Sequence, residues 1–272
     1  MGHDLFVVDE GRGPAVLAVH GQPGLSGDWE RVAARLIEDH RVLAVDRPGY
    51  GRTTGDAVGM ADNAEMLADL LVEREAAPAV VMGHSYGGGI AILMAARRPE
   101  VVRGLVLVGS VGRADSVNAM DHVLALPWAG EAFAAAGLLA LGRVLPHLRG
   151  LAAHVPGRRL RWLEASLPDH TYAETASGVG RRVWRSFVVE QRALVREIAD
   201  VEAALELVLV PTVVMTGTWD VVVPPSVAAS VAVAIAGSEL ESVARTGHFI
   251  PRDAPQQVAR AVRTVEAKSP AG

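Results

Sequence analysis

A serine flanked by glycines, in the hexapeptide GHSYGG at 83–88, is the side chain best placed to do chemistry. The hexapeptide follows an apolar run at 79–82 and precedes a helix-like run at 90–98. Strand, tight turn and helix in this order expose Ser85 at the apex, and Gly83 and Gly87 let strand and helix approach closely. A serine hydroxyl becomes a nucleophile when a base takes its proton and hydrogen-bond donors stabilise the oxyanion. The sequence therefore predicts covalent catalysis on Ser85.

A second feature is the alternation of short apolar runs with helical patterns, which must position that serine. Valine- and leucine-rich runs without polar alternation are typical of parallel strands buried on both faces, and they lie at 42–45, 79–82, 105–108 and 213–216. A further strand is expected near 239–244, and helices at 28–38, 62–75, 86–98 and 254–266. The alternation predicts an α/β fold with a mostly parallel sheet. Glycine and proline at 10–14 predict an antiparallel hairpin between 5–9 and 15–19.

Residues 113–198 break this alternation. The segment contains no valine-rich strand, and four prolines interrupt its helical patterns. We expect a helical cap over 113–198, inserted into a core made of 1–112 and 199–272.

Five motifs, in order along the chain, carry a resemblance to a known family. They are HGQPG at 20–24, DRPGYG at 46–51, GHSYGG at 83–88, GTWD at 217–220 and TGHF at 246–249. The chain resembles the α/β-hydrolase superfamily, of the serine-nucleophile type with a helical cap. The resemblance implies an eight-stranded, mostly parallel sheet flanked by helices, with the cap inserted before the penultimate strand.

The same resemblance implies the partners of the serine. His248 would be the general base and Asp220 the acid that orients it, in the chain order serine, aspartate, histidine. An imidazole has an ordinary pKa of ~6.5, so it can accept a proton near neutral pH. Asp115 is the alternative acid, because some members place it after the preceding strand. Asp46, followed directly by Arg47, is expected in an internal salt bridge or turn.

The oxyanion hole needs two pre-aimed donors. The resemblance assigns them to the backbone N–H groups of Gln22 and Tyr86, each typically worth ~3 kcal/mol of transition-state stabilisation. His20 and His84 lie inside backbone motifs, so we expect them to brace their loops.

The substrate is predicted as a small-to-medium ester, lactone or related carbonyl compound with an apolar acyl or aryl part. No metal and no organic cofactor is required for such acyl transfer. Aromatic residues of the cap and of the strand-end motifs are the candidate pocket residues: Trp128, Trp162, Trp184, Trp219 and Phe249.

The same residues also bear on other activities. Dehalogenases and epoxide hydrolases of the superfamily carry an aspartate where this chain has Ser85, which argues against both. A dinucleotide-binding oxidoreductase would need a Tyr-x-x-x-Lys pair, which is impossible because Lys268 is the only lysine. A C–C bond hydrolase, a lyase or cyclase, and a ligand-binding receptor remain alternatives, because fold does not fix the reaction.

Composition bounds the remaining possibilities. Half of the 272 residues are hydrophobic, which is enough for a sizeable core, and the absence of cysteine excludes disulfides and thiolate metal sites. The net charge of -5 gives no reason to expect nucleic acid. Neither a leader-like start nor an uninterrupted apolar span is visible, so we expect a cytoplasmic monomer or homodimer with no membrane partner.

Overall fold

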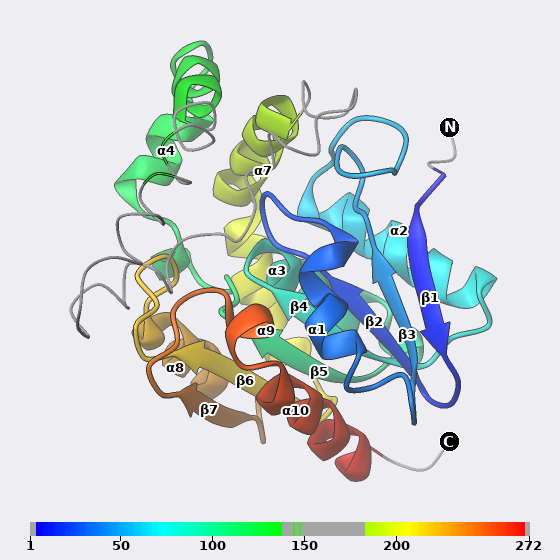
Figure 1. Cartoon of the computed structure of the whole chain (residues 1–272). Coiled ribbons are helices and arrows are strands. Elements are labelled where there is room, and N and C mark those ends of the chain that lie inside the picture. Colours follow the sequence, from blue (N-terminus) through cyan, green and yellow to red (C-terminus); the bar gives the residue numbers. More distant parts are fainter. Residues whose placement is uncertain (1–3, 138–143, 145–146, 148–182, 270–272) are drawn as a thin grey trace.

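The chain forms one sheet flanked by helices (Figure 1). The computed structural model describes residues 4–137, 144, 147 and 183–269. Over these residues the sheet has seven strands in the order β1-β3-β2-β4-β5-β6-β7. The strands are β1 (Val7–Gly11), β2 (Ala15–Val19), β3 (Arg41–Val45), β4 (Ala79–His84), β5 (Val102–Val108), β6 (Thr212–Gly217) and β7 (Glu239–Val243). The resemblance implied eight strands, and the described residues form seven, which correspond to the seven runs named from the sequence.

The first connection differs from the predicted hairpin. β1 pairs antiparallel with β3, whereas β2 pairs parallel with the other side of β3, so the hairpin prediction is wrong. Gly11 and Gly13 instead allow the chain to pass close to the backbone just before β3. A Cβ on Gly11 would lie 2.2 Å from the His40 carbonyl oxygen, and one on Gly13 would lie 2.5 Å from the Asp39 oxygen. Side chains there would block the passage of the chain over the start of β3.

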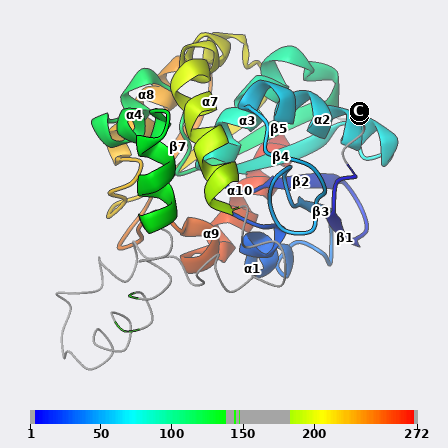
Figure 2. The same cartoon turned by 90° about the horizontal axis from the view of Figure 1, so that it is seen from above.

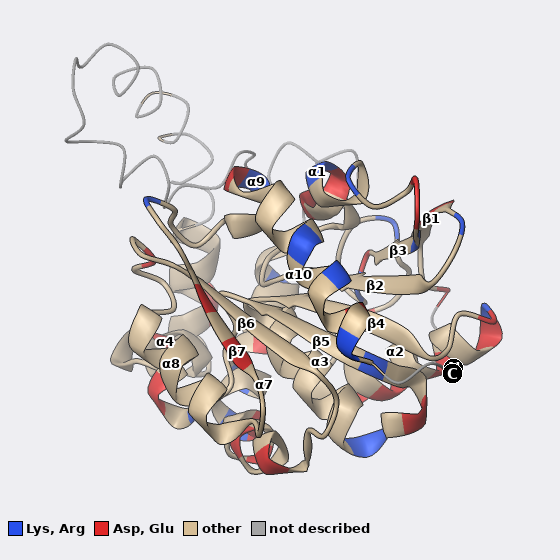
Figure 3. Ribbon diagram, turned by 90° about the horizontal axis from the view of Figure 1, so that it is seen from below, with Lys and Arg blue, Asp and Glu red and all other residues tan. Residues whose placement is uncertain are grey.

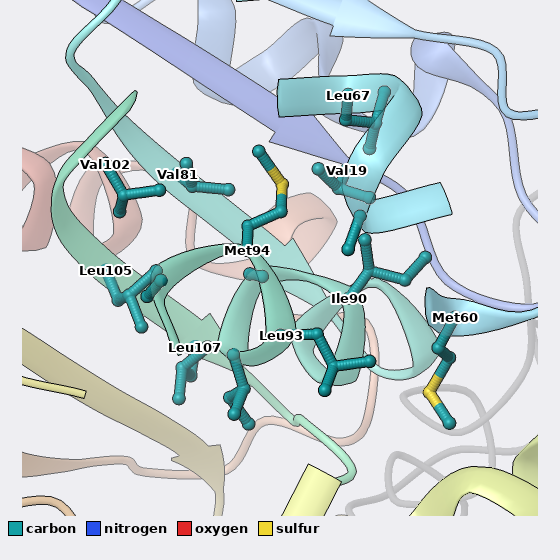
Figure 4. Packing of buried hydrophobic residues seen from close by; sticks show 14 of the residues in the cluster. Val19, Met60, Leu67, Val81, Ile90, Leu93, Met94, Val102, Leu105 and Leu107 are labelled. Atoms are coloured by element: carbon teal, nitrogen blue, oxygen red, sulfur yellow. The ribbon is translucent and has the colours of Figure 1, made fainter. Parts of the chain in front are cut away.

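Helices cover both faces of the sheet and give two hydrophobic cores. On one face lie α2 (Met60–Glu73), α3 (Tyr86–Arg97), α7 (Val183–Ala204) and α8 (Pro225–Ala234), and on the other lie α1 (Glu30–Ala33), α9 (Ile250–Asp253) and α10 (Pro255–Lys268). Successive side chains of each buried strand point to opposite faces of the sheet, so they enter the two cores in turn. Figure 4 shows the first core, where α3 packs onto the sheet through Ile90, Leu93 and Met94. The predicted helix at 28–38 is shorter: a 3-10 turn (Ser26–Trp29), α1 and further turns replace it.

α7 is the longest described helix and joins the segment predicted as a cap to the core. It packs against α4 (Ala119–Ala125) on one side and against α2 and α3 on the other (Figure 2). The helix runs through the predicted boundary between 198 and 199 without a break. The cap boundaries themselves stay a prediction, since residues 148–182 lie outside the described part of the chain.

Most charged side chains of the described residues lie at the surface, and the buried exceptions include Asp46, Arg47, Glu190, Glu197 and Asp220. Figure 3 shows acidic segments on the edge strand β7 and basic ones on α10. Lys268 at the end of α10 pairs with Glu239 at the start of β7, and Arg260 lies 3.8 Å from Glu241. Among the described helices, none is long and apolar enough to cross a membrane.

Candidate active site

Ser85 occupies a strained turn between β4 and α3. Its backbone has φ 53° and ψ -119°, a conformation that a non-glycine residue adopts only where surrounding structure enforces it. The enforcement comes from close packing of backbone. A Cβ on Gly83 would lie 2.5 Å from the Gly87 carbonyl oxygen, and one on Gly87 would lie 2.4 Å from the Val19 oxygen. The turn leaves Ser85 half-buried at the carboxyl end of the sheet.

Asp220 and His248 form a buried pair at the ends of the next strands. The Nδ1 atom of His248 lies 2.8 Å from Oδ2 of Asp220. The other carboxylate oxygen, Oδ1, accepts hydrogen bonds from the backbone N–H groups of Val222 and Val223, each at 2.9 Å. A carboxylate only accepts, so Nδ1 carries the ring proton and donates a hydrogen bond to Asp220. The lone pair of Nε2 is therefore left free to act as a base.

His84 contacts the backbone and the ring of His248. Its Nε2–H donates to the backbone carbonyl of His248 at 3.0 Å, and the two rings lie 4.7 Å apart between centroids. Burial, reinforced by the nearby His248, lowers the pKa of His84 to about 3. His84 thus stays neutral near pH 7 and adds no charge beside the imidazole, and it braces the loop that carries His248, where the sequence predicted only that it braces its own loop.

The serine hydroxyl and the imidazole are not hydrogen-bonded to each other in this structure. In the described part of the chain, the Ser85 hydroxyl has no hydrogen-bond partner. Catalytic hydrogen bonds are often long in ligand-free enzymes and shorten in the substrate complex. The structure thus places an oriented imidazole and a half-buried serine hydroxyl at the same end of the sheet, without a hydrogen bond between them.

The two expected oxyanion donors lie on the loop after β2 and at the start of α3. A Cβ on Gly21 would lie 3.1 Å from the Ser85 Cβ, which places the loop that carries Gln22 directly beside the serine. Neither the Gln22 nor the Tyr86 backbone N–H donates to any described residue. Both are therefore available to a ligand. The Gln22 side chain points elsewhere and donates to the Phe187 carbonyl of α7 at 2.7 Å.

The aromatic residues predicted to line the pocket differ in their position and exposure. Phe249 packs on the His248 ring with centroids 5.6 Å apart, and Trp219 is half-buried beside Asp220 in the chain. Trp184 is half-buried on α7, and Trp128 is 85% exposed, so its ring lines no enclosed space. Trp162 lies outside the described residues.

The alternative acid is placed differently from Asp220. Asp115 is exposed and accepts a hydrogen bond of 3.4 Å from the Ser230 hydroxyl. Asp220 is the carboxylate that holds His248. The geometry therefore favours Asp220 for orienting the base.

The strand-end motif at 46–51 contains a buried ion pair that the sequence did not reveal. Asp46 accepts backbone N–H groups of Ser26 and Arg52 at 2.7 and 2.9 Å, which forms the expected turn. Arg47 pairs with Glu190 of α7, which is 143 residues away in the chain, and both side chains are fully buried. Burial alone would lower the pKa of Arg47, but the Glu190 carboxylate raises it, so the guanidinium stays charged.

Metal ligation has no support among the described residues. Within the described ranges, no three histidine, aspartate or glutamate side chains gather in a way that could hold a metal ion.

Comparison with known proteins agrees with the fold and the motif order. A family model described as "Alpha/beta hydrolase family" matches residues 16–261. "Uncharacterized protein Rv2715" of Mycobacterium tuberculosis is 32% identical over 255 residues, covering 90% of this chain and 73% of that protein. The pimeloyl-[acyl-carrier protein] methyl ester esterase of Chromobacterium violaceum is 41% identical over 110 residues, covering 40% of this chain and 42% of the esterase.

Among solved structures, the haloalkane dehalogenase DbeA of Bradyrhizobium elkani USDA94 is similar with a TM-score of 0.74 and 23% identity, over 99% of this chain and 97% of that one. Identity this low supports the fold alone.

A three-layer α/β core with a serine turn and an Asp–His pair at its strand ends is the architecture of a hydrolase superfamily. The chain belongs to the α/β-hydrolase family, and the predicted fold class is confirmed.

Proposed function

We propose that this protein is a serine hydrolase that cleaves a small-to-medium ester, lactone or related carbonyl compound through an acyl-enzyme on Ser85. The observation that carries the proposal is the strained exposure of Ser85 at the same sheet edge as a buried Asp220–His248 pair whose Nε2 is free. Local similarity to a methyl ester esterase over 110 residues supports the same class of reaction.

In the proposed reaction these groups act in the order usual for a serine hydrolase. Ser85 Oγ attacks the substrate carbonyl carbon while His248 Nε2 accepts the hydroxyl proton. The resulting oxyanion receives hydrogen bonds from the Gln22 and Tyr86 N–H groups. The tetrahedral intermediate then collapses, and the leaving alkoxide departs as an alcohol with the proton from His248. Water, deprotonated by the same imidazole, hydrolyses the acyl-enzyme to a carboxylic acid and restores the serine.

The substrate proposal rests on the surroundings of the base. The apolar ring of Phe249 packs beside that of His248, with centroids 5.6 Å apart, and supplies a surface on which the acyl part of a substrate could pack. An apolar acyl or aryl group fits this surface best.

The test combines covalent labelling with turnover. A fluorophosphonate probe should label wild-type protein at Ser85, and p-nitrophenyl acetate and butyrate should be hydrolysed. Ser85→Ala should lose the label and at least about a thousandfold in kcat, because the nucleophile is removed, while its thermal unfolding stays cooperative. Labelling at another residue, or an Ser85→Ala variant with turnover near that of the wild type, would remove Ser85 from the mechanism. Tight ligand binding without turnover of esters or lactones would instead favour a receptor.

A further inference from the structure

The Arg47–Glu190 ion pair is fully buried, so the cost of removing both charges from water must be explained. Arg47 directly follows Asp46 at the end of β3, and Glu190 lies in the middle of α7. Both side chains are 0% exposed. A buried ion pair is often no more stabilising than apolar side chains of similar volume, because both charges lose their hydration. Stability alone therefore does not account for charges at this position.

The remaining donors of Arg47 bind the loop that carries the proposed oxyanion donor. Its Nε donates to the His20 carbonyl at 3.1 Å, and one terminal nitrogen donates to the Gly21 carbonyl at 2.7 Å. The Arg47 backbone N–H also donates to His20 Nε2 at 3.0 Å, which leaves the proton of that ring on Nδ1. His20 Nδ1–H then donates to the same Gly21 oxygen at 2.8 Å. One carbonyl thus accepts from a guanidinium and an imidazole.

That carbonyl belongs to the peptide unit whose N–H is the Gln22 donor. The peptide unit is planar, and its C=O and N–H point in opposite directions in the trans form. Fixing the Gly21 oxygen toward Arg47 therefore fixes the Gln22 N–H away from Arg47. A cationic donor on the oxygen also withdraws electron density from the amide and makes its N–H a stronger donor.

Further contacts bind the same loops to α7. Gln22 Nε2 donates to the Phe187 carbonyl at 2.7 Å, and the Ser186 hydroxyl donates to the Gly49 carbonyl at 2.7 Å. The Tyr50 hydroxyl donates to Glu190 Oε2 at 2.8 Å. The loops after β2 and β3 are therefore fastened to one helix.

We propose that Arg47, held in place by Glu190, is a positioning residue that clamps the Gly21–Gln22 peptide and aims its N–H at the oxyanion. This inference rests on the proposed function for its effect on catalysis. It predicts that the clamp acts on the transition state, where negative charge develops on the substrate oxygen, and hardly on ground-state binding.

The variant that tests the clamp removes both charges together. Arg47→Met/Glu190→Leu keeps the volume of the pair and leaves no unpaired buried charge. We expect kcat for p-nitrophenyl butyrate, per Ser85 that reacts with fluorophosphonate, to fall about 10- to 100-fold, because a donor is misaimed rather than deleted. KM should change less than about threefold, as uniform binding is untouched. An aryl boronic acid, which also places an oxygen in the oxyanion hole, should lose affinity in parallel with kcat/KM.

The matched control is a second Arg–Glu pair, between Arg192 of α7 and Glu131. Arg192 lies 3.0 Å from Glu131 and also donates to the Ala125 carbonyl, and neither loop is among its described partners. Arg192→Met/Glu131→Leu should therefore leave kcat within about twofold. If the test variant instead keeps the wild-type kcat per reactive serine, or loses only thermal stability, the pair is structural and the clamp is refuted. Should the double variant not fold, Arg47→Lys supplies the same test, since one ammonium cannot reach Glu190 and both carbonyls as the guanidinium fork does.

A second readout needs no turnover. The backbone ¹H–¹⁵N resonance of Gln22 should shift in Arg47→Met/Glu190→Leu and stay in place in the control. A shifted resonance in a protein without esterase activity would refute the proposed function and keep the clamp. An unmoved resonance would refute the clamp even where ester hydrolysis and Ser85 labelling are normal.

Discussion

Replacing Asp220 by asparagine tests the orientation of the base most directly. In the wild type, Oδ1 of Asp220 accepts the Val222 and Val223 N–H groups, and Oδ2 accepts the proton on His248 Nδ1. Asparagine has one oxygen and one NH₂ group. Its oxygen will face the two backbone donors, because the reverse orientation leaves both of them buried without an acceptor.

The size of the effect follows from that choice. Two buried donors without acceptors cost about 2–6 kcal/mol together, at about 1–3 kcal/mol each. The amide NH₂ must then face His248 Nδ1, so Nδ1 has to accept and the ring proton moves to Nε2. A protonated Nε2 cannot take the serine proton. At 1.36 kcal/mol per factor of ten, we expect kcat to fall by about 10²- to 10⁴-fold, the upper end matching the effect of this substitution on a serine protease.

Initial rates with p-nitrophenyl butyrate, together with fluorophosphonate labelling and thermal unfolding, measure this loss. Asp115→Asn is the matched control, because Asp115 is exposed and contacts only Ser230 among the described hydrogen bonds. Its kcat should stay within about twofold of the wild type. An Asp220→Asn variant that keeps more than a tenth of kcat, or a larger loss in Asp115→Asn, would refute the assignment of the acid.

Two further predictions concern stability. His84 has a pKa of about 3 in the folded protein and an ordinary value of ~6.5 when unfolded, so the unfolded chain takes up the extra proton as pH falls between these values. Because of His84, the free energy of unfolding should therefore drop by about 1.4 kcal/mol per pH unit below ~6.5. In urea titrations, His84→Gln should remove about 2 kcal/mol of the decline between pH 6.5 and 5. Parallel plots of unfolding free energy against pH for variant and wild type would contradict this. Gly87→Ala puts a methyl group 2.4 Å from the Val19 oxygen and should lower the free energy of unfolding by about 2–4 kcal/mol. Gly27→Ala, whose Cβ meets nothing within 4 Å, should change it by less than about 0.5 kcal/mol, and equal losses would exclude close approach as the cause.

The strand-end chemistry could be predicted because each group lies within a few residues after the end of a strand. Ser85, Asp220 and His248 are far apart in sequence, but parallel strands bring their carboxyl ends to one edge of a sheet. The motif order, together with the family resemblance, therefore predicted the three residues at one end of the sheet. Their distances, and the missing contact between the hydroxyl and the imidazole, depend on side-chain orientation that no motif encodes.

The errors have a common origin in long-range pairing. Glycine and proline at 10–14 indicate a sharp change of direction, but the insertion of β3 between β1 and β2 depends on residues about thirty positions later. Glu190 was missed because no motif surrounds it. Its place on the buried stripe of α7, between Ser186 and Leu194, was the available signal, because a buried carboxylate requires a partner.

The single lysine has a practical consequence for attaching the protein to surfaces. Lys268 ends α10 next to Glu239, the first residue of β7, so its ammonium lies at the amino edge of the sheet. Ser85 and His248 lie at the opposite edge. Apart from the α-amino group, amine-reactive resins therefore have one side chain to couple, and immobilised molecules linked there would all present the serine turn outward.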